Sequence, residues 1–251
     1  MNKTSKFLSL VTPQWLKDKS RNTRMYARHK IPFIARLFSK YYGLNNLDEK
    51  LEKYLNWKNG YFVELGANDG LSQSNTKYFE LFRNWSGVLV EPYPENFQKC
   101  KKNRSRNSKV FNFACVGFDF KQKRVRLAYS NLMTVSLDGR SDIDDKWGHA
   151  HEGNPFLNAG EVVHEFSIEA ITLNEILITA DSPKEIDLLS LDVEGAELEV
   201  LSGIDHELFR FKYICLESRD LQAVSKFLLV HGYEFVESLS KHDYLFKNVE
   251  K

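Results

Sequence analysis

The chain has 251 residues, of which 42% are hydrophobic and 13% aromatic, so it can bury the core of one α/β domain. Its net charge of +1 argues against a dedicated nucleic-acid binder, because such proteins usually carry a strong basic excess. No apolar stretch is long enough to span a membrane, and the N-terminus shows no signal-peptide pattern. The three cysteines have neither metal-like nor disulfide-framework spacing, which favours a reducing, cytoplasmic location.

Residues 1–45 differ from the rest of the chain in their charge. Lysine and arginine recur through this segment between apolar residues, and Asp18 is its one acid. Pro32 and Gly43 predict a helix over residues 32–42. Three interpretations stay open for this basic amphipathic extension: packing on the domain, peripheral contact with the inner face of an anionic membrane, and an oligomer contact in a homo-oligomer.

After residue 45, the sequence predicts a short helix over 47–55, a buried strand over 61–65, a turn of small residues over 66–70 and a helix over 74–85. A strand followed by such a turn and a helix presents backbone N–H groups to a cofactor. The dinucleotide pattern G-x-G-x-x-G is a poor match, because Asn68 and Leu71 stand where small residues are required. The pattern Glu64-x-Gly66-x-Asn68-x-Gly70 is instead close to the E-x-G-x-G-x-G of adenosylmethionine-dependent methyltransferases.

The remaining elements alternate between strands and helices, which predicts a parallel, doubly wound sheet. We expect strands over 87–91, 110–116, 124–129, 162–168, 186–192, 213–217, 233–237 and 244–247, and helices over 94–103, 173–179, 196–201 and 221–231. Glu91, at the end of the second strand, stands where a ribose-binding carboxylate belongs. Residues 130–160 lack clear periodicity, so we predict that they form a lid over the site.

Three stretches resemble the FkbM-type methyltransferase family: residues 62–70, 88–92 and 186–203. The most specific part is the block from Asp192 to Glu197, Asp-Val-Glu-Gly-Ala-Glu, and the resemblance runs over residues 58–220. It implies a class I methyltransferase (Rossmann-like) α/β fold, whose seven-stranded, mainly parallel sheet contains one reversed strand and is flanked by helices. Residues 46–251 would form this methyltransferase domain, and residues 1–45 its helical extension.

The resemblance also implies S-adenosyl-L-methionine as the methyl donor. Its methionine and ribose parts would be held by the residues of the first turn, Glu64, Gly66, Ala67, Asn68, Asp69 and Gly70. Glu91 would take the ribose hydroxyls, and the adenine would lie near Ala114 and Cys115. Asp192 and Glu194 would lie beside the transferred methyl group.

Methyl transfer to a weakly acidic hydroxyl requires an aligned oxygen and help in removing its proton. His149 and His151, in the predicted lid, are candidate bases or metal ligands, although solvated loop histidines are the plainer interpretation. The aromatic residues near this segment could stack on a sugar ring or simply be core residues: Tyr93, Tyr129, Trp147 and Phe156.

A divalent cation such as Mg²⁺ or Mn²⁺ is the other means of acidifying a hydroxyl. Asp192, Glu217 and Asp220 follow neighbouring strand ends, and three converging carboxylates would suit such a cation. In the alternative interpretation, Asp192 contacts cofactor or substrate directly and Glu217 pairs with Arg219 or Lys212.

Together these features predict an adenosylmethionine-dependent O-methyltransferase that acts on a sugar hydroxyl of a polysaccharide or glycoconjugate, with a carbohydrate as its acceptor and no nucleic-acid partner. Two alternatives stay open. One is methylation of a small natural product or an amine. The other is a non-catalytic module that binds the cofactor without turnover.

Overall fold

The computed structural model of the chain describes residues 40–249. Most of the predicted basic helix therefore lies outside the described residues. Its last three residues, 40–42, are described and are not helical, so the predicted helix end is wrong there. Among residues 40–249, no helix is long and apolar enough to cross a membrane.

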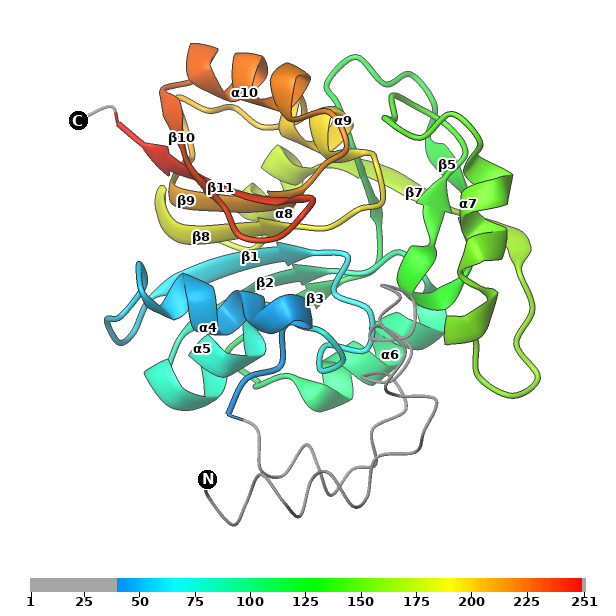
Figure 1. The fold of residues 1–251 in the computed structure, drawn as a ribbon, viewed down its shortest axis with the longest axis horizontal. Coiled ribbons are helices and arrows are strands. Elements are labelled where there is room, and N and C mark those ends of the chain that lie inside the picture. Colours follow the sequence, from blue (N-terminus) through cyan, green and yellow to red (C-terminus); the bar gives the residue numbers. More distant parts are fainter. Residues whose placement is uncertain (1–39, 250–251) are drawn as a thin grey trace. The chain divides into compact units, whose positions relative to one another are not determined.

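A seven-stranded sheet forms the centre of the described part, in the order β10-β11-β9-β8-β1-β2-β3 (Figure 1). Its strands are β1 (Tyr61–Leu65), β2 (Ser86–Val90), β3 (Lys109–Phe111), β8 (Glu185–Leu191), β9 (Arg210–Glu217), β10 (Tyr233–Ser238) and β11 (Asp243–Asn248). Neighbours from β3 to β9 are parallel, whereas β11 is antiparallel to both β9 and β10. This arrangement confirms the mainly parallel sheet with one reversed strand.

Helices cover both faces of this sheet, because the strands alternate their side chains between two apolar layers. On one face, Phe62 and Leu89 pack with α4 (Leu47–Glu52), α5 (Lys77–Arg83) and α6 (Pro94–Asn103). On the other, Val63 and Val88 pack with α8 (Leu173–Thr179), α9 (Glu197–Leu201) and α10 (Leu221–Val230). A short 3₁₀ helix, η2 (Leu44–Asn46), precedes α4.

A second sheet has the order β4-β7-β5-β6. It contains β4 (Ala114–Val116), β5 (Arg124–Tyr129), β6 (Val135–Ser136) and β7 (His164–Thr172). The prediction of one continuous strand over 110–116 is wrong, because the chain leaves the first sheet at Asn112. The side-chain amide of Asn112 donates to the carbonyls of Glu91 and Pro92 at 2.8 and 2.9 Å, and β4 then pairs with β7.

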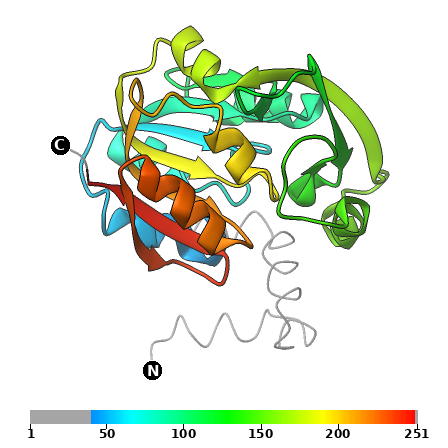
Figure 2. The same cartoon turned by 90° about the horizontal axis from the view of Figure 1, so that it is seen from above.

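Residues 130–160, which we call the lid, are more regular than their sequence predicts. They contain η3 (Asn131–Met133), β6, α7 (Lys146–Glu152) and η4 (Asn154–Phe156). Asp145 caps α7 by accepting a hydrogen bond from the backbone N–H of Gly148 at 2.9 Å. Figure 2 shows this part of the chain, in green, beside the carboxyl ends of the parallel strands.

Candidate active site

The predicted site residues gather at the carboxyl edge of the seven-stranded sheet. Two loops form its centre, one after β1 and one after β8, and β1 and β8 are parallel neighbours in the sheet. Gly66 joins the two loops: its φ is +75°, and a Cβ added there would lie 1.9 Å from the carbonyl oxygen of Asp192. Gly66 is itself exposed. Only glycine combines this backbone geometry with so close an approach.

Glu64, near the end of β1, organises the segment that follows the turn. Its buried carboxylate accepts hydrogen bonds from three successive residues, the Ser74 hydroxyl, the Asn75 backbone N–H and the Thr76 hydroxyl. The guanidinium of Arg104 lies 3.3 Å from the same carboxylate. These contacts hold residues 74–76 outside the helix, so α5 begins at Lys77 rather than at Ser74. Direct contact of Glu64 with a cofactor stays a prediction.

Polar side chains of the turn itself mainly fix its shape. Asp69 accepts hydrogen bonds from the backbone N–H groups of Leu71 and Ser72, at 2.9 and 2.6 Å. Asn68 adopts a left-handed φ of 46°, and its side-chain oxygen accepts from the N–H of Asp69. Ala67 is buried and Gly70 packs closely on Cys100. The turn therefore presents mainly backbone to the edge of the sheet.

Glu91 follows β2 and lies beneath the turn. One carboxylate oxygen accepts from the backbone N–H of Asn68 at 2.8 Å, and the other accepts from that of Tyr93 at 2.9 Å. Burial raises the pKa of Glu91 to about 7, although both N–H groups favour its ionised form. The structure thus ties the predicted ribose ligand to the predicted cofactor turn.

Ala114 and Cys115 lie on β4, in the second sheet. Ala114 is buried and Cys115 half-buried, and burial raises the pKa of the Cys115 thiol. Their contact with an adenine stays a prediction. Asn112, which sequence reasoning missed, contacts the backbone after β2 through its side chain. Its signal was weak, because an isolated asparagine has no pattern that marks such a role.

Asp192 begins the loop after β8. The residue is exposed at the surface, yet the surrounding protein removes much of the hydration of its carboxylate. That loss of hydration, followed by the negative charges of Glu217, Glu194 and Asp243, raises the pKa of Asp192 well above its usual range. A carboxylate of this kind accepts a proton more readily than an ordinary aspartate.

His149 is the lid residue that reaches this loop. Its buried Nε2 lies 2.7 Å from Oε2 of Glu194, an ion-pair distance without a hydrogen bond between the two atoms in the described part of the chain, and the guanidinium of Arg219 lies 3.6 Å from that same oxygen. The structure therefore brings together the predicted residues His149, Asp192 and Glu194. His151, the other histidine candidate, is exposed on the same helix, where its ring lies 6.2 Å from that of Trp147.

The predicted cluster of Asp192, Glu217 and Asp220 is wrong in its third member. Asp220 caps α10, where its carboxylate accepts from the backbone N–H of Ala223 at 2.9 Å. Among residues 40–249, no group of three histidine, cysteine, aspartate or glutamate side chains is placed to hold a metal ion. The described residues therefore do not fit the predicted Mg²⁺ or Mn²⁺ site.

Of the two partners expected for Glu217, Lys212 pairs with another acid, whereas Arg219 lies within reach of the negative charge of Glu217, which raises its pKa. Lys212 lies 2.7 Å from Asp187. Arg219 lies between Glu194 and Asp142, an aspartate of the lid. Sequence reasoning missed this role of Asp142 and Arg219, because the two residues are far apart in the chain.

Two further glutamates after β8, Glu197 in the block and Glu199 beyond it, accept hydrogen bonds from backbone N–H groups. Glu197 accepts hydrogen bonds from the N–H groups of Val193 and Gly195, at 3.1 and 3.3 Å, and burial raises its pKa to about 8. Glu199 accepts from the N–H groups of Gly117 and Arg140. The block therefore connects the sheet edge to the lid and to the end of β4.

The aromatic residues near the lid divide into anchors and surface residues. Tyr129 and Phe156 are buried, and the ring of Tyr129 stacks on that of Tyr93 with centroids 3.8 Å apart. The side-chain amide of Asn131 donates to the carbonyl of Phe156, and its oxygen accepts from Asn68. Trp147 is exposed. Tyr129 and Phe156 are therefore core residues rather than a sugar-stacking surface.

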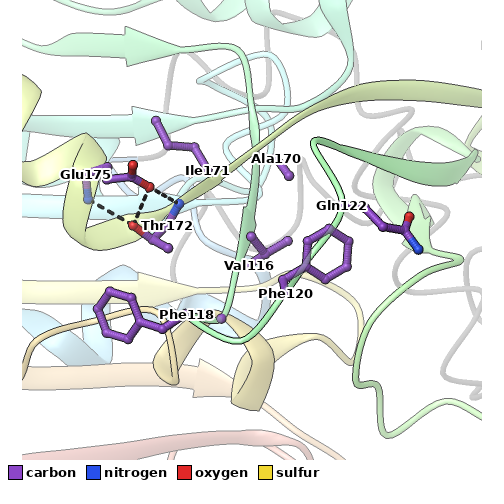
Figure 3. Close-up of a pocket in the computed structure, with 9 residues that line it drawn as sticks. Val116, Phe118, Phe120, Gln122, Ala170, Ile171, Thr172 and Glu175 are labelled. Atoms are coloured by element: carbon purple, nitrogen blue, oxygen red, sulfur yellow. Dashed lines mark hydrogen bonds between the residues drawn. The ribbon is translucent and has the colours of Figure 1, made fainter.

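A separate hollow of about 450 Å³ lies near the ends of β4 and β7 (Figure 3). It contains none of the predicted site residues, and its polar wall is the helix cap formed by Thr172 and Glu175. The residues that line it are Val116, Gly117, Phe118, Phe120, Gln122, Ala170, Ile171, Thr172 and Glu175.

Comparison with known proteins identifies the family of the chain. Residues 64–244 match the family described as the methyltransferase FkbM domain. A curated protein, "Methyltransferase 1" of Beauveria bassiana (strain ARSEF 2860), is 26% identical over 151 residues. The match covers 59% of this chain, and the chain spans 59% of the length of that relative.

Solved structures with similar folds are more distant. The METTL16 MTase domain (crystal form 2) superposes with a TM-score of 0.45 at 10% identity, covering 83% of this chain and 70% of that one. A SAM-dependent methyltransferase from Thiobacillus denitrificans, in complex with S-adenosyl-L-homocysteine, has a TM-score of 0.39 at 12% identity. That match covers 88% of this chain and 73% of the other.

Proposed function

Since the chain belongs to the FkbM methyltransferase family, we propose that it transfers the methyl group of S-adenosylmethionine to a sugar hydroxyl of a polysaccharide or glycoconjugate. The family assignment makes it an adenosylmethionine-dependent methyltransferase of the class I fold. The acceptor is our proposal. It is supported by the base system at the sheet edge and by the resemblance to a family that often methylates sugar hydroxyls.

The residues at the edge fit the methyl donor. Gly66 offers an exposed backbone that no side chain covers. Glu91 lies beneath the same turn with a carboxylate suited to ribose hydroxyls. On the segment after the turn, Gln73 Nε2 and Asn75 Oδ1 are buried and have no hydrogen-bond partner in the described part of the chain. Such atoms leave hydrogen-bonding capacity for a polar ligand. When bound, the donor supplies an electrophilic methyl carbon.

The observation that carries the proposal is the pair formed by His149 and Glu194 at 2.7 Å. A hydroxyl is a poor nucleophile until its proton is removed, so an oxygen acceptor needs a positioned base. The negative charge of Glu194 beside Nε2 of His149 favours a proton on that nitrogen, and Nδ1 then keeps the lone pair that accepts the proton of the acceptor hydroxyl. Asp192, exposed beside the cofactor turn, orients that hydroxyl by accepting a hydrogen bond from it.

The test is a methyl-transfer assay with radiolabelled S-adenosylmethionine and a panel of glycans, glycolipids, small phenols and amines. We expect a labelled O-methyl sugar, located by linkage analysis. His149→Asn and Asp192→Asn should each lower kcat at least 100-fold, because each removes a group that acts on the hydroxyl. Adenosylmethionine affinity, measured by calorimetry, should change less than about threefold.

Two control variants separate these effects from loss of the fold. Asp187→Asn changes an aspartate of β8, the strand that precedes Asp192. Asp187 bonds Tyr61 and Lys212 instead. His164→Asn changes a half-buried histidine of β7. Both should retain activity. Methylation of amines alone, or full activity in His149→Asn, would contradict the proposal.

A further inference from the structure

Four charged or ionisable groups form a continuous chain between the lid and the sheet edge. Arg219 lies 3.7 Å from Asp142 and 3.6 Å from Glu194, and Glu194 lies 2.7 Å from His149. The lid supplies the two ends of the chain, Asp142 and His149. The loops after β8 and β9 supply the two middle groups.

We propose that Asp142 and Arg219 are positioning residues that fix Glu194, and through it His149, so that lid docking and orientation of the base are one event. The inference rests on the proposed role of His149 as the base. The inference assigns a role to Asp142 and Arg219. Neither residue has a hydrogen bond or ion pair, among those found in the described part of the chain, to the predicted cofactor turn or to Asp192.

Asp142 connects the lid to both catalytic loops at once. Its carboxylate accepts hydrogen bonds from the backbone N–H of Arg219 at 2.8 Å and from the Ser218 hydroxyl at 3.1 Å. Its own backbone N–H donates to the carbonyl of Gly195 at 2.9 Å. One residue of the lid therefore holds the loop after β8 and the loop after β9 in a fixed relation.

The lid packs closely on Gly195. Gly195 has a φ of +91°, and an added Cβ would lie 2.7 Å from Oδ1 of Asp142 and 2.9 Å from both Ser141 and Ile143. The lid therefore lies directly on the backbone between Glu194 and Glu197. Movement of Asp142 would move the backbone that carries Glu194.

Arg219 lies between two carboxylates and offsets their negative charges. Burial opposes its charge, but the negative charges of Glu194, Glu217 and Asp142 raise its pKa. Without the guanidinium, Glu194 and Asp142 would repel each other across the position that it occupies. Arg219 thus holds Glu194 where a single oxygen, Oε2, faces both the guanidinium and the imidazole.

The direct test uses Asp142→Asn, which keeps an oxygen for the N–H of Arg219 but removes the charge. Asp138→Asn is a matched control, because Asp138 also lies in the lid, pairs with an arginine at 2.7 Å and accepts the N–H of that arginine, Arg126. We expect Asp142→Asn to lower kcat about tenfold, with adenosylmethionine affinity within about twofold of the native enzyme. Asp138→Asn should change neither quantity.

The pH dependence of kcat gives a readout that a purely structural role would not shift. His149 faces Glu194 directly, and Arg219 and Asp142 follow in the series of ion pairs; its own segment adds Asp145, Lys146, His151 and Glu152. Removing the negative charge in Asp142→Asn should move the acid limb of the profile to lower pH by about 0.5 unit. Removing the positive charge in Arg219→Gln should move it to higher pH by about the same amount.

Histidine NMR tests the inference without any acceptor. Long-range ¹H–¹⁵N spectra should show His149 with its proton on Nε2 in the native protein, and a mixture of tautomers in Asp142→Asn but not in Asp138→Asn. An unchanged tautomer together with an unchanged kcat in Asp142→Asn would overturn the inference. If no sugar is methylated while the tautomer changes as expected, the proposed acceptor fails and the positioning role stands.

Discussion

Two turns at the sheet edge, after β1 and after β8, are built alike but held differently. Each has a glycine at positive φ, Gly66 and Gly195, and each is organised by a buried glutamate. Glu64 accepts hydrogen bonds from the segment after the first turn, and Glu197 accepts them from the backbone of the second. The difference lies in the charges around the two glutamates.

Glu64 is paired with a cation, because the fully buried guanidinium of Arg104 lies 3.3 Å from it and 3.3 Å from Glu80. Although burial opposes ionisation of Glu80, Arg104 is the foremost of the partners that hold its pKa below the usual range. Burial raises the pKa of Glu197 to about 8, and the nearby acids Asp142 and Glu194 add to this effect. An ionic network therefore holds the turn after β1, whereas a buried carboxyl whose pKa is raised to about 8 holds the turn after β8.

We expect the largest effect from removing Arg104, the cation beside Glu64. Arg104→Met keeps the aliphatic volume but leaves Glu64 and Glu80 buried without their shared cation. We expect the free energy of unfolding to fall by about 3–5 kcal/mol, the usual cost of breaking a buried ion pair on one side. Chemical denaturation measures this change, and calorimetry should show weakened binding of adenosylmethionine.

The matched control is Arg106→Met, since Arg106 is exposed two residues further along the chain. It should change the unfolding free energy by less than about 0.5 kcal/mol. A similar small change in Arg104→Met would show that the first turn does not depend on the ionic network.

The same comparison explains which parts of the molecule could be predicted from the sequence. The first turn is a local structure, so Glu64, Gly66 and Gly70 stand close together in the chain and form a pattern. Asp192 and Glu194 were found for the same reason. The parallel, doubly wound sheet followed from the alternation of strands and helices, and the resemblance to the family implied its reversed strand, which is β11.

What could not be predicted depends on contacts between distant segments. His149 meets Glu194 across 45 residues of chain, and Asp142 meets Arg219 across 77. No periodicity or spacing encodes such contacts. The break of the predicted third strand at Asn112 depends likewise on carbonyls after β2. Asp220 was expected to bind a metal ion because strand-end carboxylates suit a cation. Its carboxylate instead accepts a hydrogen bond from the first turn of α10, where backbone N–H groups lack partners within the helix.

Glu197→Gln tests the role of Glu197 in the turn after β8 through the pH dependence of stability. The pKa of Glu197 is about 8 when folded, against a usual value of 4.5. The stabilising contribution is therefore complete below about 4.5 and is lost as pH rises toward 8, because the folded state must then keep a proton that the unfolded state releases. Glutamine keeps an oxygen for the N–H groups of Val193 and Gly195 but does not titrate.

We therefore expect the stability of Glu197→Gln relative to the native enzyme to increase with pH between about 4.5 and 8, by at most about 1.4 kcal/mol per pH unit, and to level off above that range. Denaturation series at several pH values measure it. Glu185→Gln, at an exposed position where β8 begins, is the control and should show no such trend. A difference that does not vary with pH would mean that Glu197 is ionised at neutral pH.

The smallest effect is expected for Glu91. Its raised pKa also makes the two turns less different from each other. It lies on the cofactor side, yet burial raises its pKa to about 7, so this side also contains a group that titrates near neutrality. Ribose hydroxyls donate hydrogen bonds, and the ionised carboxylate is the better acceptor. Protonation below pH 7 should therefore weaken binding of adenosylmethionine, by about tenfold between pH 8 and pH 6.

Calorimetry at several pH values, on the native enzyme and on Glu91→Gln, measures this dependence. The variant should bind more weakly at pH 8 and lose the tenfold dependence, because its amide does not titrate. Comparing the two proteins also cancels the titration of the ligand itself. Glu95→Gln, an exposed glutamate of α6, should follow the native curve. If Glu91→Gln kept the native pH dependence, the carboxylate would serve only to hold the N–H groups of Asn68 and Tyr93, and the ribose would be bound by other residues.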